Sequence, residues 1–357
     1  MLNKKRLPLT LTAALISAAI LLPAAPHTAS AAASDASVIA SITASLEQKK
    51  PTFVLNMSRS QFARVNRLLD SAAVKSEPYT RYTLDRIQTR AKINGSKASV
   101  TFSALYLESK QQADYVTAQA KATLKTLIKP GMSQDEKVKV IHDYIVTRLA
   151  YDESLTRYSA YEGLTQGTTV CQGYTLLGYR MLTLAGIETR IVEGDADGIS
   201  HVWNKIKLDG RWYNLDMTWD DPTPDQKNEV SYTYYLVNDK TLDRNHNWKK
   251  TNVPAAVSDY RSLLAKKAET SSQHRNLLDA IGGEMTTTTA SLQTKVLAAI
   301  DNQTAQLEVM HDFGSLSPKS QLDRIMKACL DTSVSEVNFA YKVASNGTAI
   351  IRFSFTY

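Results

Sequence analysis

Residues 168–222 decide the fold, and their sequence is TTVCQGYTLLGYRMLTLAGIETRIVEGDADGISHVWNKIKLDGRWYNLDMTWDDP. After Cys171 the apolar residues follow helical spacing and Gly186 supplies a stop signal, so a helix is predicted between these two residues. Thr169 and Gln172 have the spacing of a capping box at its start. Cys171 is therefore expected in the first helical turn, where the positive end of the helix dipole favours a thiolate.

Residues 201–218 predict a β-hairpin that brings a histidine and an aspartate together. Apolar and polar side chains alternate along this segment, and Asp209-Gly210 is a strong two-residue turn at its centre. With the strands paired directly across the turn, His201 and Asp216 are diagonal neighbours on one face, about 7–8 Å or less apart between Cβ atoms. A carboxylate at that distance can hold an imidazole. The opposite face is expected to be core: Val202, Ile206, Leu208, Tyr213, Leu215 and Met217.

A cysteine at a helix start beside a histidine and an aspartate is the pattern of a thiol active site, formed here by Cys171, His201 and Asp216. Ser200 is a poor nucleophile candidate, because neighbouring residues of a strand point to opposite faces. No metal site is predicted, since the cysteines and histidines are scattered along the chain. No cofactor is expected for this chemistry.

The same segments resemble the bacterial transglutaminase-like superfamily. The likeness lies in CQGY from Cys171, HVWNKIKLDGRWYNLDMTWDDP from His201 and YTYYLVND from Tyr232, and it extends over roughly residues 111–250. The resemblance implies a papain-like α+β core in which Cys171 is the nucleophile, His201 the base and Asp216 the orienting residue. Members of this superfamily include cross-linking enzymes, amidases, peptidases and catalytically silent proteins, so the reaction stays open.

Six further side chains are candidates for contacting the substrate or an oxyanion: Gln166, Gln172, Tyr158, Tyr161, Trp203 and Trp219. Three of them lie in the Tyr- and Gly-rich loop over residues 151–167, which can face the thiol across a cleft. Each of these three is a candidate donor of a hydrogen bond to the oxyanion, although the loop sequence does not establish the geometry that such a donor needs.

Two other histidines and the segment after the core are given structural roles. His142 lies on or beside the buried stripe of a helix and is interpreted as a surface or packing residue. His246 follows the core and is interpreted as a packing contact that closes the domain. Residues 260–267 and 274–281 have short helical patterns. The polar residues 285–289 after them are expected to be turn-like or exposed.

Residues 1–31 have the pattern of an export signal. They combine a basic start at residues 4–6, an apolar run over residues 9–22 and small residues at 29–31. An uncleaved membrane anchor is the alternative, but the run is shorter than the about 20 residues that span a bilayer. We therefore expect a secreted protein without a membrane segment after cleavage, and association with the cell wall is one option.

Composition is that of an ordinary globular protein, with 357 residues, 43% hydrophobic and 22% charged. This length allows two or three domains. The net charge is +7, and removal of Lys4, Lys5 and Arg6 with the signal lowers it to +4. A solvated surface explains this balance better than binding to anionic polymers. Basic residues are dispersed and no nucleic-acid motif is present, so the expected partner is a protein or peptide substrate.

The two cysteines, Cys171 and Cys329, could form a single disulfide in an exported protein. Residues 322–330, however, form an amphipathic helical pattern in which a small apolar side chain fits the buried face. We therefore predict that Cys329 is a packed free thiol.

The segments 42–106 and 297–357 have the same predicted order, which is one strand, one helix and a hairpin with an Asn-Gly turn at Asn94 or Asn346. The predicted fold is α+β, a papain-like transglutaminase core with the cysteine helix packed on an antiparallel sheet, flanked by two small β-α-β-β modules. The expected organisation is a signal peptide at 1–31, an N-terminal α+β module at 32–110, a transglutaminase-like catalytic core at 111–250, a helical connector at 251–296 and a C-terminal α+β module at 297–357.

These features together predict an exported thiol enzyme that acts on amide bonds of protein or cell-wall peptide. Cys171 would form an acyl-enzyme, and water or an amine would then resolve it. The alternative is a catalytically silent binding or structural protein at the cell surface that uses the same fold. An intact Cys/His/Asp set favours the enzyme.

Overall fold

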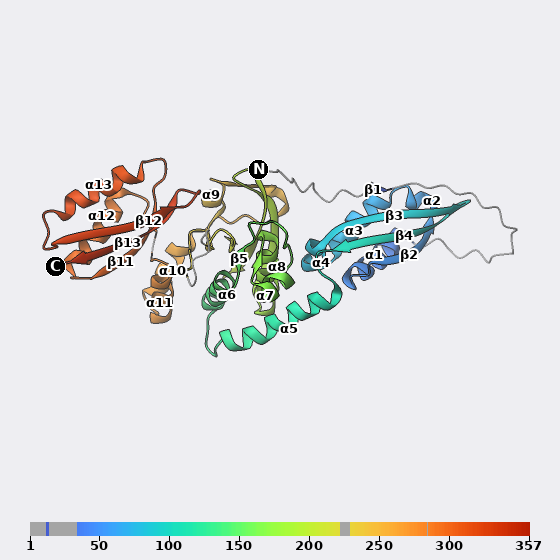
Figure 1. Ribbon diagram of the computed structural model, residues 1–357, viewed down its shortest axis with the longest axis horizontal. Helices are drawn as coiled ribbons and strands as arrows, with labels where there is room; N and C mark the ends of the chain where they lie inside the picture. Colours follow the sequence, from blue (N-terminus) through green and yellow to red (C-terminus); the bar gives the residue numbers. More distant parts are fainter. Residues whose placement is uncertain (1–11, 14–33, 222–228, 284) are drawn as a thin grey trace.

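The computed structural model describes residues 12–13, 34–221, 229–283 and 285–357, and three parts follow one another along its long axis (Figure 1). The predicted export signal at residues 1–31 lies outside the described residues, apart from the two-residue strand β1 (Thr12–Ala13), which pairs with β3. Within the described part of the chain, no helix is both long and apolar enough to cross a membrane.

The N-terminal part packs helices on a sheet with the order β1-β3-β4-β2. Its other elements are α1 (Asp35–Glu47), β2 (Thr52–Ser58), α2 (Arg59–Phe62), α3 (Val65–Lys75), α4 (Pro78–Thr83), β3 (Leu84–Asn94) and β4 (Lys97–Tyr106). Both β2 and β3 pair with β4 in the antiparallel sense. The predicted order of strand, helix and hairpin is present, and α1 precedes it.

The core holds the cysteine helix against an antiparallel sheet with the order β10-β7-β8-β9. Its helices are α5 (Lys110–Leu127), α6 (Gln134–Arg148), α7 (Ala160–Gln166), α8 (Cys171–Leu184), α9 (Asp239–Leu242) and the 3₁₀ helix η1 (Lys250–Asn252). Its strands are β5 (Ala150–Tyr151), β6 (Thr168–Thr169), β7 (Glu188–Ala196), β8 (Ile199–Leu208), β9 (Arg211–Leu215) and β10 (His246–Trp248). The predicted papain-like arrangement of helix and sheet is therefore confirmed.

The β8–β9 hairpin has the expected register, with Leu208 opposite Arg211. Asp209 and Gly210 have φ values of 47° and 76°, as a two-residue hairpin turn of this type requires. All six side chains predicted as core are buried. The face that bears His201 is more enclosed than the hairpin alone suggests, because Trp203 on that face packs into a second apolar cluster with residues near 234–248.

The start of α8 differs from the prediction. Val170 is the N-cap, and it makes no capping hydrogen bond through its side chain. Thr169 belongs to β6, so its hydroxyl donates to the carbonyl of Ser159 at 3.3 Å instead of capping the helix. A Cβ atom at Gly173 would lie 2.1 Å from Oγ1 of Thr169, so this close approach requires glycine.

The predicted connector contains α10 (Tyr260–Ala268) and α11 (Ser272–Ala280), as expected. Both helices pack into the hydrophobic cluster of the core, so they are part of its structure. The segment 285–289 is not an exposed turn throughout, because Thr286 is buried and donates its N–H to the carbonyl of Met310 at 2.9 Å. This pairing ties the segment to β11.

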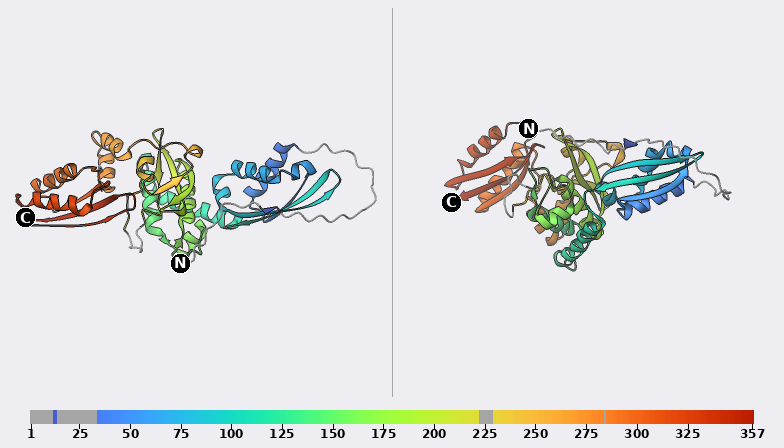
Figure 2. Two further views of the ribbon diagram at one scale, coloured as in Figure 1. Left: turned by 90° about the horizontal axis from the view of Figure 1, so that it is seen from above. Right: turned by 45° about the vertical axis from the view of Figure 1, so that its right-hand side comes forward.

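The C-terminal part repeats the topology of the N-terminal part. Its elements are α12 (Thr289–Asp301), β11 (Gln306–Asp312), α13 (Pro318–Cys329), β12 (Glu336–Val343) and β13 (Thr348–Thr356). The sheet order is β11-β13-β12, so the first strand again lies beside the last, and helices cover one face of each flanking sheet (Figure 2). The predicted boundary between residues 296 and 297 falls inside α12 and is wrong, because α12 packs on α13 in one cluster.

Cys329 is a free thiol in the structure, as predicted. It is buried at the end of α13 among apolar side chains, and burial raises its pKa.

Candidate active site

The structure brings together the histidine and aspartate that the hairpin register predicted. His201 lies on β8, and Asp216 lies one residue beyond the end of β9. Nε2 of His201 is 2.6 Å from Oδ2 of Asp216, and both side chains are buried. Cys171 is the first residue of α8 and is partly exposed, so the thiol can be reached by a reagent or substrate.

The surroundings of Asp216 stabilise its negative charge. Oδ1 accepts the backbone N–H groups of Thr218 at 3.1 Å and Trp219 at 3.3 Å. Burial alone would raise the pKa of the Asp216 carboxyl, but His201 and His246 outweigh burial and hold that pKa well below its usual range. Asp216 is therefore an ionised acceptor at neutral pH.

His201 is held in its protonated form by its two neighbours. Burial by itself lowers the pKa of an imidazole, but the Asp216 carboxylate and a hydrogen bond with Cys171 oppose it and raise the pKa of His201 to about 10. Nε2 is engaged by Asp216, which leaves Nδ1 for the sulfur. The site therefore places an imidazolium between a carboxylate and a thiol.

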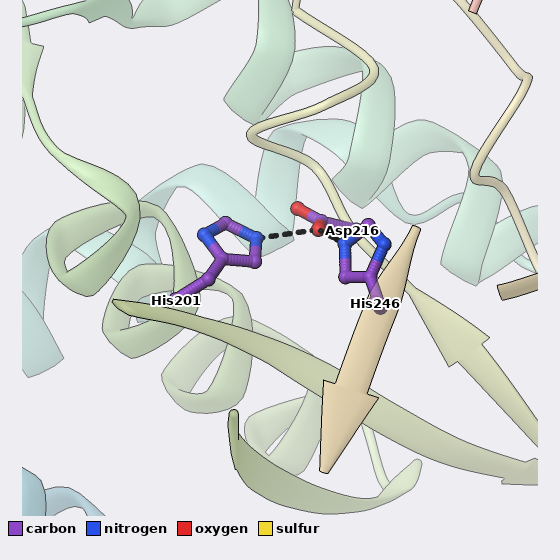
Figure 3. A group of neighbouring side chains, drawn as sticks. All are labelled: His201, Asp216 and His246. Atoms are coloured by element: carbon purple, nitrogen blue, oxygen red, sulfur yellow. Dashed lines mark hydrogen bonds and ion pairs between the residues drawn. The ribbon is translucent and has the colours of Figure 1, made fainter. Parts of the chain in front are cut away.

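His246 is a member of the site that sequence reasoning missed. Its Nε2 lies 3.0 Å from Oδ2 of Asp216, the same oxygen that His201 contacts (Figure 3). The interpretation as a plain packing residue is therefore incomplete. Strand β10 brings His246 to the site by pairing with β7, with His246 opposite Ala196. The sequence has no local signal for this pairing.

The two histidines and Asp216 also have the ligand types of a metal site, and one ligand atom from each lies within 4.8 Å of the others. Separations of 2.6 and 3.0 Å are those of charge-assisted hydrogen bonds. Both rings donate to a single oxygen, so we interpret the group as a hydrogen-bonded cluster.

Of the two tryptophans predicted for the site, Trp219 lines the cleft beside Cys171, and its ring lies edge-on to His201 at 6.1 Å. Trp203 stacks on His201 with centroids 5.9 Å apart, but it is buried and does not line the cleft. Its indole N–H donates to Oδ1 of Asn214 at 3.2 Å. Trp203 therefore packs against His201 without reaching the cleft.

The other four candidates do not line the cleft. Gln166 is exposed and accepts from Nε of Arg157 at 2.6 Å. Gln172 donates to the carbonyl of Tyr82 at 2.6 Å and so links α8 to the N-terminal part.

The two loop tyrosines are not among the residues that line the cleft. The backbone N–H of Tyr158 donates to the Glu162 carboxylate at 2.9 Å, and the ring of Tyr161 packs edge-on against Tyr115 at 5.4 Å. The prediction that this loop supplies the oxyanion donor through these residues is not supported by their positions.

A different tyrosine, Tyr151, lies where Tyr158 and Tyr161 were expected. It lines the cleft, and the parallel pairing of β5 with β6 sets it opposite Thr169, two residues before Cys171. Burial, and then the charge of Cys171, raise the pKa of Tyr151 to about 12. Its phenol therefore keeps its proton at neutral pH and can donate a hydrogen bond.

The cleft has a volume of about 660 Å³ and lies between the core and the C-terminal part. Cys171 and His201 belong to the core wall, whereas residues 340–345 and Arg352 on β12, β13 and their turn form the facing wall.

A partly exposed cysteine at a helix start, paired with a buried histidine and aspartate, is the arrangement of a candidate thiol site. Residues 121–217 match the family model of the Transglutaminase-like superfamily. The core of this chain is therefore a transglutaminase-like core.

Two curated relatives are similar to the chain. The human (Homo sapiens) kyphoscoliosis peptidase is 24% identical over 207 residues, which are 48% of this chain and 31% of the relative. The mouse (Mus musculus) protein of the same name is 24% identical over 171 residues, or 40% of this chain and 26% of the relative. The chain thus spans less than a third of either relative.

Among solved structures, a TGase is 15% identical with a TM-score of 0.26, covering 44% of this chain and 47% of that chain. A provisionally assigned cysteine protease from Cytophaga hutchinsonii is 17% identical with a TM-score of 0.25, covering 36% of this chain and 55% of that chain.

Proposed function

We propose that this protein is a thiol enzyme that transfers the acyl group of a protein or peptide amide to water or to an amine. The observation that supports this most directly is the His201 imidazolium, which hydrogen bonds Asp216 at 2.6 Å and also contacts Cys171. A silent binding protein with the same fold has no need of this pair beside an accessible sulfur.

The reaction begins when the sulfur of Cys171 attacks the amide carbonyl and forms a tetrahedral oxyanion. His201 then gives its proton to the departing amine, and a thioester remains on the sulfur. Formation of the thioester removes the negative charge that Cys171 contributed to the high pKa of His201. The pKa of the imidazole therefore falls, and the ring can take a proton from the water or amine that attacks the thioester.

Two groups are placed to bind the oxyanion. The first N–H groups of a helix have no partner within the helix, and Cys171 is the first residue of α8. The neutral phenol of Tyr151 lines the same cleft. We assign Tyr151 as an oxyanion donor, in place of the residues that the loop sequence suggested.

The proposed substrate is a peptide segment or a glutamine side chain that enters the cleft between the core and the C-terminal part. The pattern at residues 1–31 supports export, so the substrate is proposed to lie outside the cell, with cell-wall peptide as one candidate. The printed name of the human and mouse relatives is that of a peptidase, which makes hydrolysis a reaction to test.

The test is turnover of a panel of glutamine-containing peptides with and without a primary amine, followed by ammonia release and by mass spectrometry of the products. We expect hydrolysis or amine incorporation by the parent protein, and none by Cys171→Ala. Activity that survives in Cys171→Ala, or no product from any peptide by a parent with an alkylatable Cys171, would count against the enzyme.

A further inference from the structure

Two histidines share one carboxylate oxygen in this site, and the proposed reaction uses only one of them. His201 hydrogen bonds with Cys171. His246 approaches Asp216 from β10 on the other side of the carboxylate from His201 (Figure 3). Oδ2 of Asp216 lies 2.6 Å from Nε2 of His201 and 3.0 Å from Nε2 of His246. Because the carboxylate is ionised and only accepts, the N–H group of each of these ring nitrogens donates a hydrogen bond to it.

His246 gives the Asp216 carboxylate a second side-chain donor, which fixes its orientation. The other oxygen, Oδ1, accepts the N–H groups of Thr218 and Trp219. Without His246, a single contact from His201 would remain on Oδ2, and the carboxylate could turn with that ring. With His246 present, the direction in which Oδ2 presents its lone pairs to His201 is set by a second, fixed donor.

His246 is itself held on every side. Its ring packs against Trp203 at 5.2 Å, Trp219 at 5.1 Å and Tyr234 at 5.5 Å between centroids. Its Nδ1 is 2.9 Å from Oδ1 of Asn245. It is almost completely buried, so solvent does not compete for either ring nitrogen.

The C-terminal part reaches this histidine through hydrogen bonds. The amide of Asn245 donates to the hydroxyl of Tyr234 at 2.9 Å, and the backbone N–H of Asn346 donates to the same hydroxyl at 3.2 Å. Arg244 fastens this contact, because its guanidinium binds the carboxylate of Asp312 with two contacts of 2.6 Å and the carbonyl of Asn346 at 3.0 Å. The turn between β12 and β13 is therefore anchored behind the candidate active site.

We propose that His246 is a positioning residue that orients Asp216 and, through it, the catalytic imidazole of His201. This inference rests on the proposed function, because it assigns a role within the same site. The ionisable groups that face His246 are Asp216, His201 and the phenol of Tyr234. The anchoring through Asn346 makes the C-terminal part a support of the same arrangement.

The test compares substitutions that differ in one property, the presence of a donor near Oδ2 of Asp216. His246→Gln can place an amide N–H close to the position of Nε2, His246→Asn is too short to do so, and His246→Leu has no donor. His311→Leu is the matched control, because His311 is also buried with both ring nitrogens bonded, to Thr286 and Gln321, and it does not line the cleft.

The readout is the rate at which iodoacetamide modifies Cys171 between pH 5 and 9, measured by peptide mass spectrometry well below each melting temperature. We expect His246→Leu and His246→Asn to react about tenfold more slowly than the parent near neutral pH, the order expected for loss of a charge-assisted hydrogen bond. His246→Gln should recover most of that loss, and His311→Leu should keep the parent profile even if it melts earlier.

The proposal is overturned if His246→Leu reacts at the rate and with the pH profile of the parent. If His246→Leu does not fold, equal rates for His246→Gln and His246→Asn overturn it instead. Asp216→Asn, measured in parallel, distinguishes failure of the positioning role of His246 from failure of the thiol site. If alkylation is slow in Asp216→Asn but the His246 variants keep the parent rate, only the positioning role is refuted. If Asp216→Asn also keeps the parent rate, the coupled thiol site itself is refuted.

Discussion

Replacing Asp216 with asparagine preserves the size of the side chain and removes the negative charge that His201 faces. The pKa of His201 is about 10, against 6.5 for an ordinary imidazole, and this difference favours the imidazolium by on the order of 5 kcal/mol. Burial by itself favours the neutral imidazole, and the interactions with Asp216 and Cys171 together favour the imidazolium. The charge and hydrogen bond of Asp216 are the largest contributions that raise the pKa of His201, and burial opposes them, so in Asp216→Asn this pKa should fall back to its ordinary range. About a tenth of the rings would then be imidazolium near pH 7.5, so alkylation of Cys171 should slow by about tenfold there.

The assay is the second-order rate of iodoacetamide modification of Cys171 across pH for the parent and Asp216→Asn, with thermal melts at each pH. Asn214→Ala is the control, because Asn214 is buried on the neighbouring strand but contacts Trp203 instead of His201. The variant Asp216→Asn should be slow near pH 7 and approach the parent at high pH, where a thiolate forms without help. If Asp216→Asn is alkylated at the parent rate at every pH, Asp216 is not coupled to Cys171 through His201.

The same substitution should change how stability depends on pH. Because the pKa of His201 is raised in the folded protein, its contribution to stability is fully present below about pH 6.5 and is lost as the pH rises through about 10. The pKa of Asp216 is lowered, so its contribution is present above about pH 4 and is lost as the pH falls. The parent should therefore lose melting temperature between pH 6.5 and 10, and Asp216→Asn should lose less over that range.

Three further predictions concern the surroundings of the site. Tyr151→Phe should lower peptide turnover by about 10²-fold, as loss of an oxyanion donor does. The rate of iodoacetamide alkylation of Cys171 should stay within about threefold of the parent rate, because alkylation forms no oxyanion. Equal losses in both assays would contradict the assignment of Tyr151. Gly173→Ala should destabilise the protein by about 1–3 kcal/mol in urea unfolding, since its Cβ would lie 2.1 Å from Oγ1 of Thr169. Leu215→Asp should abolish the cooperative melt, because Leu215 is fully buried and an unpaired carboxylate there is costly, whereas Leu215→Met should cost less than about 1.5 kcal/mol.

The parts of the fold that follow local rules could be predicted from the sequence. The Asp209-Gly210 turn sets the register of β8 and β9, and this register places His201 beside Asp216. The helix after Cys171 follows from apolar periodicity. In each of these cases the deciding residues lie within a few positions of one another, so the pattern alone is sufficient.

The remaining features depend on contacts between distant segments. His246 reaches Asp216 because β10 pairs with β7, and Tyr151 reaches the cleft because β5 pairs with β6 over only two residues. The predicted capping box failed for a similar reason, since Thr169 hydrogen bonds to the carbonyls of Arg157 and Ser159 in a preceding loop. The facing wall of the cleft comes from β12 and β13, more than a hundred residues after the cysteine. No local pattern encodes these pairings.

In the proposed reaction, Cys171 is a nucleophile that forms an acyl-enzyme with the help of His201. The most direct measurement mixes the native protein with a peptide ester, stops the reaction in acid within seconds to minutes, and locates any acyl group by peptide mass spectrometry. We expect a thioester on Cys171 in the parent, much less in His201→Ala, and none on Cys329, which is buried. Absence of acylation at Cys171 in the folded parent, or equal acylation of parent and His201→Ala, would contradict it.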